Sequence, residues 1–255
     1  MKAFIRTNLA ILFLLISCSV NAQQWQTFDR PFEFGVRAGV NLSRVNGLKN
    51  PDISRVANKP SGWAEDTKNI FGINLALTFD YHLSRKVYLS SALQFLTKGT
   101  KFDFREDRPQ YILSSPDSKM NQFYLQVPVH VGYKFQLSRP VRLSVHGGPY
   151  VSYGIGGHTE RGDMIRKIDR ETGLQMGGEM SLNDYAQIEK GIAREADTFS
   201  DKGLRRFDFG VGCGVLVEYY QIGFGLNYDF GLLDLSNAGD KVKNGVGYLT
   251  VGYKF

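Results

Sequence analysis

Apolar and polar residues alternate with a period of two along most of the chain, and the alternation recurs eight times. This period is typical of β-strands, in which successive side chains point to opposite faces of a sheet. We therefore predict eight strands, over residues 32–43, 71–81, 87–95, 123–135, 141–153, 207–219, 222–230 and 245–255.

The links between these strands alternate between long and short. Short links, HLSRK, QLSRP and YY, follow the second, fourth and sixth strands, whereas the long links cover residues 44–68, 98–121, 156–204 and 233–244. Transmembrane barrels with long outer loops and short periplasmic turns have this arrangement, and a soluble sandwich has no reason to sort its loops by length. The predicted fold is all-β: an eight-stranded antiparallel transmembrane β-barrel with both chain ends on the periplasmic side.

Each predicted strand has one face without charge, which we expect to meet the lipid of the outer membrane, and an opposite face with charged side chains. Eight strands leave an interior just wide enough for side chains, so we expect the charged faces to form a plugged interior and not a pore. Buried charges need partners, which favours ion pairs over acid–base catalysis. The expected lumen polar network comprises Glu33, Arg37, Arg142, Arg206, Asp208, Glu218 and Asp229.

The chain ends in GVGYLTVGYKF, in which apolar residues occupy alternate positions up to the last. An open sheet edge is not tolerated in lipid, so the last strand must close against the first. Leu249, Val251, Tyr253 and Phe255 also resemble the C-terminal signal that the outer-membrane assembly machinery reads. We therefore expect that machinery as a partner of the last strand.

The first 22 residues are typical of a secretory signal peptide, with Lys2 and Arg6 before an apolar core and VNA at the cleavage site. The predicted domains are residues 1–22 as the signal peptide, residues 23–31 as a short N-terminal segment and residues 32–255 as the barrel. An alternative is lipoprotein cleavage within LISC, after which Cys18 would be acylated. Under the first cleavage only Cys213 remains, so no internal disulfide can form.

The charge of the chain argues against nucleic acid as a partner. The formal net charge is +6, but the basic residues are scattered and do not interleave with aromatic residues in one patch.

Five segments resemble the PorT-like outer-membrane β-barrel proteins of Gram-negative bacteria: FGVRAGVNLS, LQVPVHVGYKF, LSVHGGPYVSYGIGG, RRFDFGVGCGVLVEY and FGLNYDFGLLDLS. The resemblance covers residues 32–255 and implies an outer-membrane barrel. It implies no particular activity. Some members of the family assist protein secretion, and no segment of this chain marks it as one of those.

His130 and His146 are the best candidates for chemistry. Both lie on the inward parity, and a tight hairpin that pairs residue 134 with residue 142 would place the two histidines directly opposite each other. They could then share a proton or a metal ion, although no third ligand is evident. The alternative is that both are polar lumen residues that bond to Tyr124, Tyr150 or water.

The longest link, residues 156–204, is rich in charge and is the first choice for a protein partner. Within it, SLNDYAQIEKGIAREAD predicts a short helix that Ser181 caps. The favoured hypothesis is a non-enzymatic outer-membrane protein, structural, adhesive or accessory, that acts through its outer loops without a cofactor. The alternatives are a lumen enzyme or ligand binder centred on His130 and His146, and a soluble periplasmic barrel.

Overall fold

The computed structural model describes residues 31–47, 62–107, 111–169, 171–188, 195–199, 204–236 and 242–255. The predicted signal peptide and Cys18 lie outside these residues. The elements are β1 (Phe32–Asn46), β2 (Gly62–Lys68), β3 (Ile70–His82), β4 (Val87–Asp107), β5 (Tyr111–Gln136), β6 (Val141–Glu160), β7 (Met164–Asp169), β8 (Met180–Ser181), α2 (Leu182–Ile188), β9 (Glu195–Asp197), β10 (Phe207–Tyr219), β11 (Ile222–Gly231) and β12 (Lys243–Lys254).

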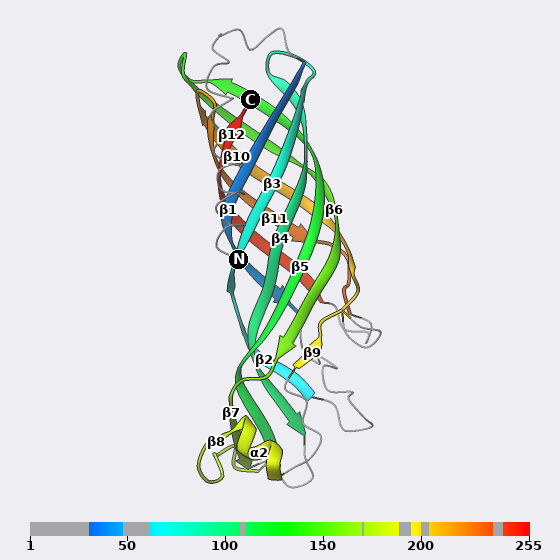
Figure 1. The fold of residues 1–255 in the computed structure, drawn as a ribbon, viewed down its shortest axis with the longest axis vertical. Helices are drawn as coiled ribbons and strands as arrows, with labels where there is room; N and C mark the ends of the chain where they lie inside the picture. The colour runs from blue at the N-terminus through cyan, green and yellow to red at the C-terminus, as the bar shows by residue number, and fades with distance from the viewer. Residues whose placement is uncertain are drawn as a thin grey trace, which may run out of the picture.

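Eight of these strands pair in a closed antiparallel ring, in the order β1, β3, β4, β5, β6, β10, β11, β12 and back to β1. The other four strands enlarge the sheet to 12 strands: β2 pairs with β4, β7 with β5, β8 with β7 and β9 with β6. All four gather with α2 at one end of the molecule, opposite the C-terminus (Figure 1). We call this end the head end.

The opposite end carries the three short links, and we call it the turn end. The links are residues 83–86, 137–140 and 220–221 in the described structure. Tyr220 has a φ of 56°, the left-handed conformation that a two-residue hairpin needs. The predicted division into short and long links therefore separates the two ends of the ring.

The prediction that residues 98–121 form a loop is wrong. β4 and β5 continue through this segment as paired strands, and only residues 108–110 fall outside the described structure. The inward positions stay buried, for example Phe102, Phe104 and Met120, but the outward positions are no longer apolar. The pattern that marked the other strands ends there because an outward face beyond the lipid does not have to be apolar.

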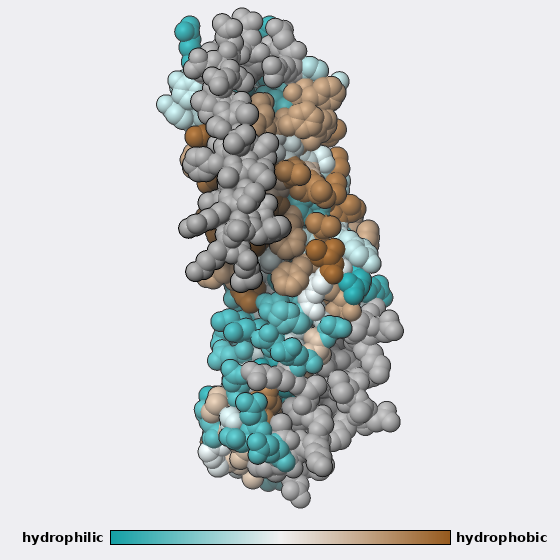
Figure 2. All heavy atoms as spheres, in the orientation of Figure 1, coloured by the Kyte–Doolittle hydropathy of each residue, from teal (hydrophilic) through white to brown (hydrophobic). Residues whose placement is uncertain are grey.

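Burial alternates along the ring strands and divides each of them into two faces. On β5 every second residue from Leu125 to Phe135 is exposed and apolar, and the residues between them are buried. β1, β3, β10, β11 and β12 have the same division. The exposed residues form a wide apolar surface on the ring, whereas the head end is mainly hydrophilic (Figure 2). We call this surface the apolar belt.

The last strand closes the ring as the sequence predicts. β12 pairs with β1 over its whole length, including Val251 with Ala38 and Tyr253 with Val36. Phe255 continues the contact by donating its backbone N–H to the carbonyl of Phe34 at 2.8 Å. Leu249, Val251 and Phe255 are more than half exposed and belong to the apolar belt.

Candidate functional site: the lumen and the head

Lys254 is the centre of an ion-pair cluster inside the turn end. Its Nζ lies 2.8 Å from Asp80, 3.3 Å from Glu33 and in close contact with Glu218. These carboxylates come from β3, β1 and β10, so the penultimate residue of the chain joins four strands of the ring. A buried charge with three partners is satisfied electrostatically only when all four strands are in place.

Two further cations complete this cluster. Lys134 Nζ lies 3.4 Å from Glu33, and Arg142 Nε lies 3.3 Å from Glu218. The His82 ring also contacts Glu33, at 3.1 Å. We call Glu33, Asp80, Lys134, Arg142, Glu218 and Lys254 the Lys254 cluster, in which three positive charges face three negative ones.

The head half of the lumen holds two more of the expected acidic residues. Lys98 Nζ lies 3.6 Å from Asp208, and both side chains are fully buried. Asp229 accepts hydrogen bonds from Gln126 at 2.7 Å and from Tyr248 at 3.3 Å. The predicted network is therefore divided between two places, with Glu33, Arg142 and Glu218 near the turns and Asp208 and Asp229 farther in.

The two remaining predicted members lie elsewhere. Arg37 is half-buried on β1, on the inward parity of that strand. Arg206 is not in the buried network: it is exposed just before β10, where it donates to the carbonyl of Gly154 at 2.9 Å. The apolar–polar alternation predicts that Arg206 is an inward residue of the strand, but β10 begins only at Phe207.

Sequence reasoning left four charged residues out of the candidate network: Asp80, Lys98, Lys134 and Lys254. Asp80, Lys134 and Lys254 lie on the polar parity of predicted strands, so the alternation itself could have named them. Lys98 gave no such signal because it lay in a segment predicted to be a loop.

His130 and His146 do not face each other directly. Gln136 pairs with Arg142, and in the same register His146 lies opposite Gly132. The prediction paired residue 134 with residue 142 and is wrong by two positions. The rings still meet diagonally, with centroids 5.4 Å apart and planes 22° apart.

The surroundings of the two imidazoles differ. His146 Nε2 shares a hydrogen bond of 2.9 Å with Asn227 Oδ1. His130 Nε2 is buried and has no hydrogen-bond partner among the described residues. Gly212 and Gly214 leave the space that both rings occupy, since a Cβ at either glycine would lie about 3 Å from the nearest ring nitrogen. In the described part of the chain, no three residues of the metal-ligating types are grouped closely enough to hold an ion.

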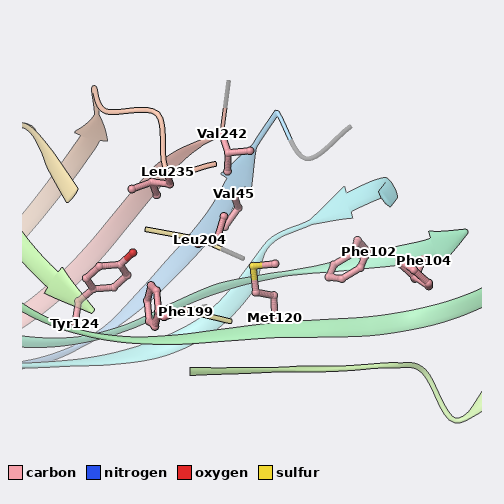
Figure 3. Packing of buried hydrophobic residues seen from close by; sticks show 9 residues of the cluster. All are labelled: Val45, Phe102, Phe104, Met120, Tyr124, Phe199, Leu204, Leu235 and Val242. Atoms are coloured by element: carbon pink, nitrogen blue, oxygen red, sulfur yellow. The ribbon is translucent and has the colours of Figure 1, made fainter. Parts of the chain in front are cut away.

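A cluster of apolar side chains fills the head end of the lumen. Figure 3 shows its nine members, which come from ring strands and from segments of the long links. Phe199 packs edge-on against Tyr124, with centroids 5.4 Å apart. It occupies the space above Gly154, where a Cβ would lie only 2.4 Å from the ring. We call this cluster the plug: Val45, Phe102, Phe104, Met120, Tyr124, Phe199, Leu204, Leu235 and Val242.

Beyond the plug, the head has a second apolar core. Leu113, Ile165, Leu182 and Tyr185 pack together, and they join β5, β7 and α2. As predicted, Ser181 caps the helix: its Oγ accepts the backbone N–H of Asp184 at 3.1 Å. The segment predicted as a long loop therefore contributes a folded unit that packs on the extension of β5.

The described residues contain no helix that is long and apolar enough to cross a membrane.

A closed ring with an apolar outer belt and a charged interior is the arrangement of a transmembrane barrel. The family model described as "Outer membrane protein beta-barrel domain" matches residues 21–237. The chain belongs to this family. Membership in the outer-membrane β-barrel family indicates an outer-membrane location, and it does not single out the PorT-like branch. A search of curated proteins found no match.

Solved outer-membrane proteins are similar to this chain at low sequence identity. Ail of Yersinia pestis, solved with a heparin analogue, is 14% identical, with 89% of this chain and 100% of that chain covered at a TM-score of 0.41. Neisserial surface protein A is 13% identical, with 87% and 97% covered and a TM-score of 0.41. The outer-membrane protease OmpT of Escherichia coli is 9% identical, with 92% and 99% covered and a TM-score of 0.43.

Proposed function

We propose that this protein is a non-enzymatic, eight-stranded integral outer-membrane protein whose barrel anchors a folded head that binds a protein partner. Its role is that of a structural, adhesive or accessory subunit of the PorT-like kind. The strands cross the membrane along the apolar belt, the turn end faces the periplasm and the head end faces outward.

The observation that carries this proposal is the contrast between the filled lumen and the developed head. Tyr88, Tyr124 and Tyr150 point into the ring, and each is at most 1% exposed. An open, water-filled lumen would leave such inward side chains exposed, so the lumen is filled. The Lys254 cluster occupies one end of the lumen and the plug occupies the other. A substrate has little access to such an interior, so recognition falls to the head.

The head exceeds what is needed to connect neighbouring strands. β4 has 21 residues and β5 has 26, whereas a membrane-spanning strand needs about 9–11. The extra length carries β2, β7 and α2 and encloses its own apolar core. A chain that only had to close the barrel would not need a second core.

A head replacement tests this function. Residues 164–188, which contain β7, β8 and α2, are replaced by a Gly/Ser linker, and Phe199 and the plug are kept. Since closure entropy depends weakly on loop length, we expect a heat-modifiable barrel that inserts normally. It should lose the protein that cross-links to the intact chain in native membranes. Retention of that partner by a folded variant would contradict the proposal.

The second candidate is a ligand site in the lumen, favoured by the buried His130 Nε2 that lacks a hydrogen-bond partner. The pair of changes His130→Gln and His146→Gln tests it in the same cross-linking assay. If this variant loses the partner or ligand and the head variant keeps it, the lumen is the site.

A further inference from the structure

Three lysines lie side by side on the outer surface of the head end. Lys68 of β2 pairs directly with Lys101 of β4, and Lys101 pairs directly with Lys119 of β5. Directly paired residues project from the same face of a sheet, with Cβ atoms about 4.5–5.5 Å apart. Lys101 and Lys119 lie on the same parity as the belt residues Leu93 and Leu125. The row, which we call the lysine row, therefore faces outward.

Like charges in directly paired positions destabilise a sheet. Among the described residues, none of the three lysines forms an ion pair. Glu160 lies opposite Lys119 on β6, but its carboxylate contacts His158 at 3.0 Å. Asp103, two positions from Lys101 on the same strand, accepts the backbone N–H of Asp117 at 3.3 Å. Glu160 in turn pairs directly with Glu195 of β9, so the three adjacent lysines form the positive end of this cross-strand row and have no direct ion-pair partner among the described residues.

The lysine row begins where the apolar belt ends. Lys68 precedes Phe71 by three positions, and Phe71, at 81%, is the most exposed large apolar side chain among the described residues. Lys119 precedes Phe123 by four positions, and the Phe123 ring stacks on Phe95 with centroids 6.4 Å apart. Three or four strand residues span about 10–13 Å, and less along the membrane normal because barrel strands tilt. The ammonium groups therefore lie at the depth of lipid headgroups and not far out in solvent.

We propose that Lys68, Lys101 and Lys119 form a binding site for the phosphate groups of phosphorylated lipid headgroups in the outer leaflet. This rests on the outer-membrane placement proposed above. The acyl chains would contact the belt beside Phe71 and Phe123, and the phosphates would neutralise the row. The lipid supplies each ammonium group with a direct anionic partner, so binding should stabilise the strands β2, β4 and β5 against one another.

The test compares unfolding of the full barrel in neutral detergent micelles with three additives: lipid A, dephosphorylated lipid A, and inorganic phosphate at the same phosphate concentration. The variant carries Lys68→Gln, Lys101→Gln and Lys119→Gln. The control removes the same charge at the turn end, through Arg85→Gln, Lys86→Gln and Arg139→Gln.

In plain micelles we expect the lysine-row variant to be at least as stable as the wild type, because like-charge repulsion is relieved. Lipid A should raise the unfolding midpoint of the wild type and the turn-end control but not that of the variant. Its affinity for the variant should fall about 100-fold, since one lysine near an anionic surface contributes on the order of fivefold. If the triple variant fails to fold, Lys119→Gln alone, at an exposed position, should lower the affinity about fivefold.

Three results would overturn the site. Equal stabilisation by lipid A and its dephosphorylated form would show that only the acyl chains matter. Equal stabilisation by inorganic phosphate would show an adventitious anion site. Equal loss in the turn-end control would show a general charge effect. None of these would refute the membrane placement, which depends on the belt and is tested separately.

Discussion

Replacing Lys254 by Met should destabilise the barrel more than any other single charge removal on β12. The change keeps the length of the side chain but removes the ammonium group that contacts Glu33, Asp80 and Glu218. Removal of one partner from a buried ion pair typically costs about 3–5 kcal/mol. We expect the lower part of that range, about 3 kcal/mol, because Lys134 and Arg142 still compensate two of the carboxylates.

The assay is equilibrium urea unfolding in detergent micelles, followed by heat-modifiability on gels. A loss of about 3 kcal/mol corresponds to a change of about 100-fold in the unfolding constant. Lys243→Met is the matched control because Lys243 is exposed on the same strand, and it should cost less than about 0.5 kcal/mol. Adding Asp80→Asn to Lys254→Met should recover part of the loss. If Lys254→Met costs no more than the control, the reasoning about closure is refuted.

Three further predictions concern the belt, the plug and the head. Val129→Arg, in the middle of the belt on β5, should reduce insertion at a cost of about 2–4 kcal/mol. The control Gln136→Arg, at the turn end, should cost about 0–1 kcal/mol. Equal yields of heat-modifiable protein from the two variants would contradict the assigned faces. Phe199→Ala should destabilise the plug by about 3–5 kcal/mol and expose the head to limited proteolysis; an unchanged digestion pattern would contradict this. The backbone N–H of Thr172 donates to the Asp169 carboxylate and lowers the pKa of that carboxyl. The turn that contains both residues should therefore be fully stabilised at pH values above the ordinary Asp pKa, and it should loosen as the pH falls through the lowered pKa. A carboxyl NMR titration of Asp169 with a midpoint no lower than in an unfolded peptide would be the opposing result.

The sequence was sufficient for the ring because lipid imposes a strict rule on it. A strand in the belt must present apolar residues on one face, so β5 could be read from Leu125 to Phe135 without a structure. The same rule explains why β12 could be placed against β1.

The head could not be predicted in this way, because the constraint ends where the lipid ends. Thr100, Phe102 and Phe104 face inward on β4, but their outward neighbours include Lys101 and Asp103, and the segment resembled a charged loop. Neither the plug nor the lysine row has a sequence signature, since their members come from separate strands and depend on register.

Register also limited the prediction of the site. The centre of the hairpin lies at Arg139, one residue later than the predicted pairing requires, and this moves every cross-strand partner by two, so His146 lies opposite Gly132 and not His130. Parity was correct for both histidines, because a shift of two keeps each side chain on its face. The sequence could thus assign residues to the lumen but could not assign partners within it.

The outward position of Cys213 on β10 offers the most direct test of the central claim, a ring whose apolar face meets lipid. A nitroxide is attached to Cys213 of the processed protein in lipid bilayers, and its collision rates with oxygen and with a water-soluble nickel chelate are measured by electron paramagnetic resonance. Gln175→Cys in a Cys213→Ser background serves as the control, at an exposed position of the head between β7 and β8. We predict frequent collision with oxygen and little with nickel at Cys213, and the reverse at position 175. A label at Cys213 that collides freely with the nickel chelate would contradict the account.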